Sequence, residues 1–568
     1  MLIFGDHERI RDPRALAASL RDALSRPPRT EMRTDTLGRH AALVGAFIEA
    51  GELAQGLADA EATERGCDAR GGSAETAMTL LLALARAVVA SWCGEPAPLE
   101  PALRLLDTLR AARLPAAVAL RRAEGYAFHA VYPEAYYLAA RRAAEQRPGA
   151  RRVIGIRSIG AGLAAMVAAA ARAPSPTTVR PGGDPWRREL ALDPALVRTW
   201  VEDPHTTVAI ADEGPGLSGS SFGAVIDRLQ ESGVALDRIE CYPSHRGEPG
   251  PVALPRDLAR WRRLRREVVD CDELLVRSGV LARWIADLVG PLTTPLADIS
   301  AGAWRRLRCA SEAEWPPVVV HQERRKFLAE TADGWWLARY VGLGRDGERA
   351  IALARGLYRD GFVPEPRGLV HGFLVERWVR AARLLQPRRF GRAHLRDRVG
   401  RYLGRRAFLP TGEPGASAAA LLAMARHNSG LPLDGWAPRI PALDRRMRRV
   451  AVDGRLHAWE WLVLPTGALV KTDAVDHHRA HDLVGCQDIA WDLAGAEHEL
   501  GLDGDDLAAL IGHGDRELRA FLRICYLAFQ LGRHALARDS AWPGEVARLD
   551  AAVDGYRAAL ELAVRRAV

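Results

Sequence analysis

The sequence predicts a multidomain protein of mixed α/β and α+β class, with a helical N-terminal region, a parallel-sheet domain and a second mixed domain at the C-terminal end. Three observations predict this class. With 568 residues, the chain is too long for one hydrophobic core. Its hydrophobic fraction of 48% and charged fraction of 26% are typical of folded globular proteins. The hydrophobic periodicity also changes near residues 120 and 316, first from helical to strand–helix alternation and then to a new mixed pattern.

These changes divide the chain into four parts. Residues 1–120 carry Leu and Ala at helical spacing and predict a helical N-terminal region. Residues 121–260 alternate short apolar strands with helices, which predicts a parallel sheet covered by helices. Residues 261–315 are rich in Pro, Gly and Arg and predict a connector, whose assignment to either neighbour is open. Residues 316–568 combine hairpins, an amphipathic helix and a helical end.

The charge and cysteine composition argues against several classes of protein. The net charge is +8, but only Lys326 and Lys471 are lysines, and arginine supplies the other 77 of the 79 basic residues. This small excess is spread along the chain and gives no strong signal for nucleic acid. Seven scattered cysteines without C-x-x-C spacing predict neither a disulfide framework nor a cysteine-based zinc site.

The apolar runs do not predict a membrane protein. The most apolar run, residues 78–92, is shorter than the roughly 20 residues that a membrane span needs, and it contains an arginine. We therefore expect a cytoplasmic protein with small-molecule substrates and no membrane partner, and an oligomer is compatible with the sequence.

The strongest local pattern lies in residues 207–229. An apolar strand ends in the adjacent carboxylates Asp212 and Glu213, and a Gly/Ser loop then leads into a helix. Free amides and hydroxyls at a helix start suit a phosphate monoester, whereas two acids suit hydroxyl groups or a metal ion. The pattern predicts a site for a molecule with a phosphate and a diol, and the alternative is an ordinary turn at the end of a strand. The predicted phosphate cradle consists of Ser218, Gly219, Ser220 and Ser221.

This segment resembles the type I phosphoribosyltransferases. The resemblance implies that Asp212 and Glu213 hold the ribose hydroxyls of phosphoribosyl pyrophosphate (PRPP) together with Mg²⁺, while the cradle holds its 5-phosphate. The sequence departs from the family pattern in three ways: the acid-to-cradle spacing is one residue longer, serines replace threonines, and the loop lacks a carboxylate base. The resemblance further implies a pyrophosphate loop with Arg157, Ser158 and Gly160 and a covering loop with Arg180, Arg187 and Arg188.

Aromatic residues shortly before this segment have two interpretations. They form either a hood that stacks on an acceptor or part of the core at helical spacing. These residues are Phe128, Tyr132, Tyr136 and Tyr137.

Residues 453–496 resemble the aminoglycoside phosphotransferase branch of the protein-kinase-like fold. The order of a catalytic loop, a hairpin and a metal-binding aspartate is similar, and it places Asp473 on that aspartate. The resemblance implies a two-lobed C-terminal domain, with Glu376 in the hinge and Arg339 where the family has its ATP-contacting lysine. The catalytic aspartate position, however, holds Arg455.

The same stretch has candidate metal ligands. Glu460 takes the place of the family's asparagine, and Asp473 with Glu460 remains a possible metal pair. Lys471 precedes Asp473 by two residues. Lysine is retained there, in a chain whose other basic residues are almost all arginine, either for a functional reason such as nucleotide binding or by chance. A dense group of ligand-type residues leaves open a transition-metal site, an active-site loop that shares Mg²⁺ with a phosphate, or a solvated loop. The group comprises Asp473, Asp476, His477, His478, His481 and Asp482.

The sequence therefore predicts an enzyme of the glycosyltransferase class. It would use PRPP and Mg²⁺ for phosphoribosyl transfer, or the reverse, to an unidentified small-molecule acceptor. Asp212, Glu213 and Arg157 would act at the reacting centre, and Arg157 with the arginines of residues 180–188 would take the leaving pyrophosphate. One alternative is a small-molecule kinase that uses ATP through the C-terminal domain. The other is a non-catalytic module that senses phosphoribosyl compounds or nucleotides.

Overall fold

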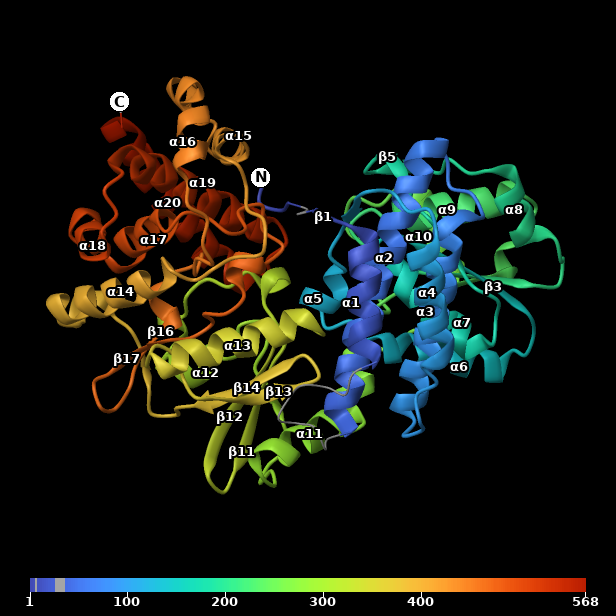
Figure 1. Ribbon diagram of the computed structural model, residues 1–568. Helices are drawn as coiled ribbons and strands as arrows, with labels where there is room; N and C mark the ends of the chain where they lie inside the picture. Colours follow the sequence, from blue (N-terminus) through green and yellow to red (C-terminus); the bar gives the residue numbers. More distant parts are fainter. Residues whose placement is uncertain (6–7, 26–35, 568) are drawn as a thin grey trace.

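The computed structural model describes residues 1–5, 8–25 and 36–567 (Figure 1). The predicted N-terminal helices are present, and strand β1 pairs antiparallel with β2 beside them. Helices α2 and α3 are long and apolar enough to cross a membrane, but most of their apolar surface is buried inside the protein. The bounds are β1 Arg9–Arg11, α1 Pro13–Ser25, α2 Thr36–Arg65, α3 Gly72–Trp92, α4 Glu100–Ala111 and β2 Val118–Leu120.

The predicted parallel sheet has five strands in the order β4-β3-β7-β8-β9. Helix α7 connects β3 to β4, and α9 connects β7 to β8. The strand order reverses between β3 and β7, and ligands of such sheets bind beyond the carboxyl ends of the strands at this point. The bounds are β3 Arg151–Ile156, α7 Gly160–Ala171, β4 Thr177–Val179, β7 Thr207–Ala211, α9 Ser220–Glu231, β8 Ile239–Tyr242 and β9 Arg265–Arg266.

Two glycines let helix α7 lie close to the sheet. A Cβ atom on Gly155 would come within 2.3 Å of the Gly160 carbonyl oxygen, and one on Gly160 would come within 2.7 Å of the Ala211 carbonyl oxygen. Only glycine fits this approach, so the small-residue pattern of the sequence brings the start of α7 next to the end of β7.

Further elements flank this sheet along the chain. A hairpin of β5 and β6 follows β4, and α5 and α6 precede β3. Figure 1 shows α5 between the two halves of the molecule. The bounds are α5 Glu124–Phe128, α6 Pro133–Gln146, β5 Gly182–Asp184, β6 Arg187–Glu189, α8 Pro194–Val201 and α10 Pro255–Arg263.

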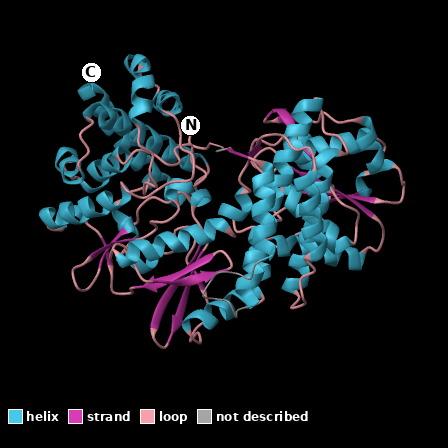
Figure 2. Cartoon of the chain, viewed as in Figure 1, coloured by secondary structure: helices cyan, strands magenta, loops and turns pink. Residues whose placement is uncertain are grey.

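The C-terminal half begins with a five-stranded antiparallel sheet in the order β10-β11-β12-β14-β13 (Figure 2). Strand β10 comes from the predicted connector and pairs with β11, so the connector contributes to this sheet. Helix α13 crosses from β12 to β13. The bounds are α11 Val280–Val289, β10 Ala297–Asp298, α12 Arg305–Arg308, β11 Lys326–Thr331, β12 Gly334–Tyr340, α13 Arg345–Arg359, β13 Pro366–Val370 and β14 Phe373–Trp378.

The remainder of the chain forms a larger, mainly helical lobe. It contains a three-stranded sheet of order β15-β16-β17 and the helices α14 to α20. The bounds are β15 Arg383–Leu384, α14 Arg392–Arg406, α15 Ala418–Ser429, α16 Ile440–Arg446, β16 Trp461–Val463, β17 Leu469–Lys471, α17 Ala490–Leu500, α18 Gly504–Ile511, α19 Arg516–Asp539 and α20 Pro543–Ala567.

The two halves share one buried core. Residues of α2, α3, α6 and α7 belong to the same hydrophobic cluster as residues of β11, β12 and β14. The Tyr132 hydroxyl donates to the His371 carbonyl oxygen at 2.9 Å, and the Leu343 amide donates to the Tyr126 carbonyl oxygen at 3.0 Å. The contact between the halves is therefore specific rather than a flexible tether.

Candidate functional site

Asp212 and Glu213 lie at the carboxyl edge of the parallel sheet, directly after β7. The Tyr136 hydroxyl donates to the Asp212 carbonyl oxygen at 2.9 Å and fixes this turn. Both acids line a cavity of about 730 Å³. Burial, opposed by the Glu213 amide and aided by the Glu213 charge, raises the pKa of Asp212 to about 8.

The predicted serine cradle divides into two parts. Ser218 and Ser220 both donate to the Pro185 carbonyl oxygen, at 3.1 and 2.7 Å, so they hold the turn of the β5–β6 hairpin. Gly219 has a φ of 68° and precedes α9. Ser221, in the first turn of α9, lines the cavity together with the two acids. The first-turn amides of a helix lack intrahelical acceptors, so this end of the cavity suits an anion.

The predicted pyrophosphate arginines have partners from the N-terminal helices. Arg157 Nε donates to Asp59 at 2.9 Å, its other nitrogens bond Asp68 and Thr178, and Arg180 Nε donates to Asp59 at 2.6 Å. The charges of both arginines are therefore balanced within the protein, and their role toward pyrophosphate stays a prediction.

The remaining members of this predicted set lie at different places. Ser158, beside Arg157, lines a second cavity of about 240 Å³ that also contains Glu213. Gly160 packs α7 against the end of β7. Arg187 and Arg188 lie on β6, outside the residues that line the Asp212 cavity.

The core interpretation fits two of the aromatic residues, and their role as a hood over an acceptor stays a prediction. Tyr132 and Tyr136 are buried in the core and also line the Asp212 cavity. Phe128 stacks on His481 of the C-terminal half, with ring centroids 6.1 Å apart. Tyr137 is half-buried against Arg141.

A further cavity, of about 200 Å³, lies between the two lobes of the C-terminal half. Lys326 of β11, Arg339 of β12 and Glu376 of β14 line it from the first lobe. Lys326 and Arg339 are directly opposite each other in the sheet register. Glu376 is buried, and burial raises the pKa of its carboxyl group.

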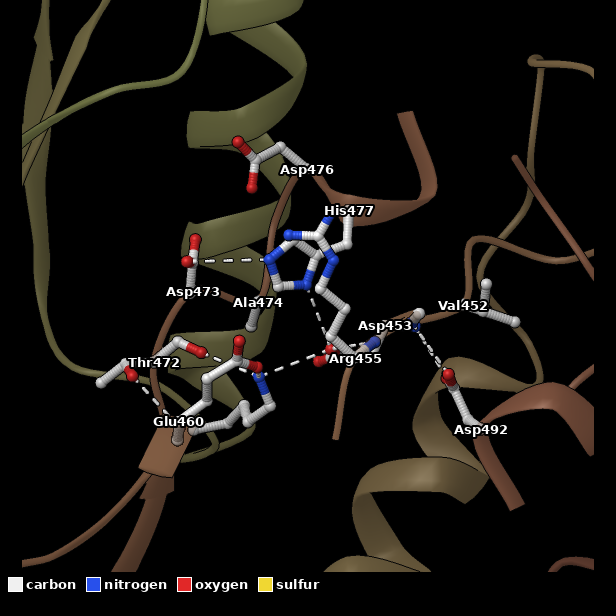
Figure 3. Close-up of polar contacts among 12 residues, drawn as sticks. Val452, Asp453, Arg455, Glu460, Thr472, Asp473, Ala474, Asp476, His477 and Asp492 are labelled. Carbon is white, nitrogen blue, oxygen red and sulfur yellow. Dashed lines mark hydrogen bonds and ion pairs between the residues drawn. The ribbon is translucent and has the colours of Figure 1, made fainter. Parts of the chain in front are cut away.

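Asp473 lines the same cavity from the larger lobe. Figure 3 shows its carboxylate beside His477, with Asp476 nearby. Asp473 Oδ1 lies 2.8 Å from Arg339 Nη1, and the same nitrogen donates to Asp476 Oδ1 at 3.2 Å. Asp473 has a φ of 55°, in the left-handed region that L-residues rarely adopt and that often marks a functional site. Arg339 is therefore held by two carboxylates.

The loop that the sequence resemblance aligns with a catalytic loop has a charge pattern different from that of the resembling family. Arg455 Nη2 donates to Asp482 at 2.9 Å. Glu460 accepts a hydrogen bond from Lys471 Nζ at 2.8 Å, and Lys471 also lies 3.4 Å from Asp453. Positive and negative side chains thus alternate through this loop, and no carboxylate occupies the position of Arg455.

The sequence analysis did not single out Asp453, which lies at the centre of this polar network. Asp453 is fully buried and contacts Lys471, while its backbone amide donates to Asp492 at 2.7 Å. His477 Nδ1 lies 3.5 Å from Asp453 Oδ1, and its Nε2 lies 3.7 Å from Asp473 Oδ2. Although burial and Arg455 oppose it, these two carboxylates raise the pKa of His477 to about 8. The sequence offered one signal for this role: Asp453 is a carboxylate two residues before Arg455, in the segment D-G-R.

The predicted group of ligand-type residues separates in space. Asp473, Asp476 and His477 bring ligand atoms within 4.8 Å of one another. Only residues 477–479 form a short 3₁₀ turn, so His477 and His481 do not share a helical face. His481 instead lies 3.0 Å from Glu124 of α5, in the other half of the protein.

The carboxylates of this group fit a magnesium ion in part. Carboxylate oxygens are ligands that Mg²⁺ prefers, but Asp476 Oδ2 already lies 3.3 Å from Arg324 Nη2 in an ion pair. Glu460 groups with Asp453 and His477, whereas Asp473 groups with Asp476 and His477, and the predicted Asp473–Glu460 metal pair stays a prediction. Arg339 neutralises both of these acids, and a cation would share them with its guanidinium.

No protein-family model matches the chain, and no curated protein matches it. The choline kinase LicA from Streptococcus pneumoniae is 15% identical over 41% of this chain and 89% of that chain, with a TM-score of 0.27. A choline/ethanolamine kinase family protein from Mesorhizobium loti is 15% identical over 51% and 100%, with a TM-score of 0.30. Spectinomycin phosphotransferase is 10% identical over 48% and 93%, with a TM-score of 0.29.

Each of these alignments spans about half of the chain or less. Identities and TM-scores this low carry no argument about the fold, the activity or the substrate of this chain. The similarity does not bear on phosphoribosyl transfer.

Proposed function

We propose that the chain is a small-molecule phosphotransferase that binds ATP with Mg²⁺ in the cleft between the two lobes of its C-terminal half. One observation carries this proposal: of the two lysines of the chain, Lys326 lines this cleft, and Lys471 donates from below to Glu460, which lines it too. Arginine occupies all other basic positions. An ammonium group is a compact charge that a planar guanidinium does not replace, so retention of lysine at these two positions indicates a chemical need.

The two lysines have different tasks in this proposal. Lys326 lines the cavity opposite Arg339 and is the group that meets nucleotide phosphates. Lys471 is fully buried and holds Glu460 and Asp453 in place beneath the cavity floor. Mg²⁺ carried with the nucleotide would be held by Asp473 and Asp476 and would neutralise phosphate charge.

Arg455 indicates the kind of acceptor. A guanidinium at the position where the resembling family orients the acceptor with a carboxylate favours an acceptor that itself carries negative charge. Its partner Asp482 leaves part of the guanidinium directed at the cavity, which Arg455 lines. We therefore propose a phosphorylated or otherwise anionic small molecule.

The binding step is tested by calorimetric titration of Mg-ADP into wild type and Lys326→Met. The near-isosteric variant removes the charge, so we expect nucleotide affinity to fall by a factor of ten or more. Arg355→Met, on the exposed face of α13 in the same lobe, is the matched control and should leave affinity unchanged. Wild type that binds no nucleotide, or a Lys326→Met protein that binds like wild type, overturns the proposal.

Phosphoribosyl transfer at the parallel sheet is a second candidate function. The observation in its favour is that Asp212, Glu213 and Ser221 line one cavity at the point where the strand order reverses. PRPP with Mg²⁺ should bind wild type and not the Asp212→Asn, Glu213→Gln double variant. Binding at either site without turnover of any substrate would instead favour the sensing function.

A further inference from the structure

We infer that the sheet-edge cavity and the cleft between the lobes are two parts of one active site. In this arrangement a phosphorylated sugar of the ribose 5-phosphate type, held at the sheet edge, accepts the phosphoryl group of the nucleotide in the cleft. The inference rests on the proposed phosphotransferase function and names the acceptor class for it.

The walls of the cavities carry this inference. His129, directly after α5, lines both the Asp212 cavity and the cleft between the lobes. The 240 Å³ cavity lies between the two: it shares Glu124 and Glu213 with the sheet edge, and Phe128 and His481 with the cleft. The three cavities therefore follow one another around α5, which lies between the halves in Figure 1.

His129 has the chemistry of a proton acceptor at this junction. Its Nδ1 bonds the Glu213 carboxylate, and its side chain is 45% exposed. A histidine whose Nδ1–H is held by a carboxylate presents Nε2 to accept a proton from a substrate hydroxyl. Among the described residues, none forms a hydrogen bond with His129 Nε2.

His477 and Asp482 line the cleft, but the position from which the resembling family orients the acceptor is cationic. Arg455 and its partner Asp482 occupy the position from which a carboxylate would orient the acceptor. The neighbouring wall is cationic, because Arg324 lies over the Phe128 ring and donates to the Ala127 carbonyl oxygen at 2.7 Å. An anionic acceptor with a free hydroxyl thus finds cations on the cleft side and His129 on the sheet side.

The interface between the halves keeps this junction in place. The carboxylate of Glu134 on α6 is completely buried between two histidines, His40 Nε2 at 2.8 Å and His371 Nε2 at 3.1 Å. Although burial opposes it, the histidines hold the pKa of Glu134 well below its ordinary value. Residues of the N-terminal helices, the sheet domain and the first lobe meet here, so neither cavity can move independently without breaking buried polar contacts.

The transfer step balances as follows. A hydroxyl oxygen of the sugar phosphate attacks the γ-phosphorus of the nucleoside triphosphate, and the bond from that phosphorus to the β-phosphate oxygen breaks. The products are a nucleoside diphosphate and a sugar bisphosphate. The hydroxyl proton passes to His129 Nε2 and from there to solvent.

The test measures transfer of ³²P from γ-labelled ATP to ribose 5-phosphate by the full chain with Mg²⁺. We expect wild type to form labelled sugar bisphosphate. His129→Asn should lower this rate at least 100-fold, while the dissociation constants for Mg-ADP and ribose 5-phosphate change less than threefold. His205→Asn is the matched control, because His205 is exposed at the opposite, amino edge of the sheet, and its rate should equal wild type.

Three results would overturn the inference. Nucleotide binding that depends on Lys326 without transfer to ribose 5-phosphate overturns it and leaves the proposed function standing. If His129→Asn transfers the phosphoryl group as fast as wild type, His129 is not the proton acceptor, and the inference of a shared site is overturned. Absence of nucleotide binding to wild type overturns the proposed function and the inference together.

Discussion

The two candidate sites treat the same side chain in opposite ways. Asp212, at the sheet edge, has no cationic partner among the described ion pairs, and burial raises its pKa to about 8. Asp473, in the cleft, is also buried, but Arg339 2.8 Å away keeps its pKa well below the ordinary range. The difference teaches that the nearest countercharge, rather than burial itself, decides whether these carboxylates are ionised.

The comparison also separates what each site is able to bind. A carboxyl group without a cationic partner, such as Asp212, suits the hydroxyl groups of a sugar or a cation brought with it. Acids that are already balanced by cations leave those cations available to phosphate when a ligand arrives. The sheet edge therefore fits the sugar, and the cleft fits the polyphosphate.

The largest expected effect comes from breaking the countercharge in the cleft. Arg339→Met leaves Asp473 and Asp476 buried without their cation, which should cost about 3–5 kcal/mol of unfolding free energy. Denaturant titration measures this loss, and Arg339→Lys should recover much of it because it keeps the charge. An unchanged transition midpoint in Arg339→Met would show that the pair does not hold the cleft together.

A smaller effect should appear in the pH dependence of stability. The folded pKa of His477, about 8, exceeds its ordinary value of 6.5. The contribution of His477 to the free energy of unfolding is therefore complete below pH 6.5 and is lost as the pH rises through 8. The difference is about 2 kcal/mol. Thermal unfolding of wild type between pH 6 and 9 should show this loss, and the curve of His477→Gln should be flatter. Parallel curves for the two proteins would contradict the assignment.

The sheet edge should show proton release on ligand binding. Free Asp212 holds a proton at pH 7 because its pKa is about 8. A ligand that binds the ionised carboxylate, such as Mg-PRPP, must displace this proton, and its affinity should rise about tenfold for each pH unit up to 8. Calorimetry in buffers of different ionisation enthalpy counts the protons, and Asp212→Asn should release none from this position. Binding heats independent of the buffer would exclude this linkage.

The smallest effect separates the two kinds of serine in the predicted cradle. Ser220→Ala removes the hydrogen bond to the Pro185 carbonyl oxygen and should cost about 1 kcal/mol of stability. Ser221→Ala should leave stability unchanged and weaken binding of ribose 5-phosphate, because Ser221 lines the cavity. If the two variants behave equally in both assays, Ser220 does not differ from Ser221 in holding the hairpin, and Ser221 does not differ from Ser220 in contacting the ligand.

Much of the fold follows from local patterns. The apolar run before Asp212 forms β7, and the Gly/Ser loop leads into α9, because burial on both faces and a helix start are readable from a few neighbouring residues. The helical N-terminal region and the C-terminal hairpins follow in the same way. The structure of the connector is harder to predict from local patterns. Its strand β10 has only two residues, and it pairs with β11, some thirty residues further along the chain.

The sequence by itself determined which residue types stand at each strand end, including the acid pair, the serine loop and the replacement of the family's catalytic aspartate by Arg455. Only the tertiary structure decided their charge and their neighbours. Asp59 and Asp68 engage Arg157, Glu213 bonds a histidine 84 residues away, and Asp473 lies against Arg339 of another lobe. The physical reason is that periodicity and turn chemistry act over a few residues, whereas countercharges come from whichever distant segment the packing of the core brings near.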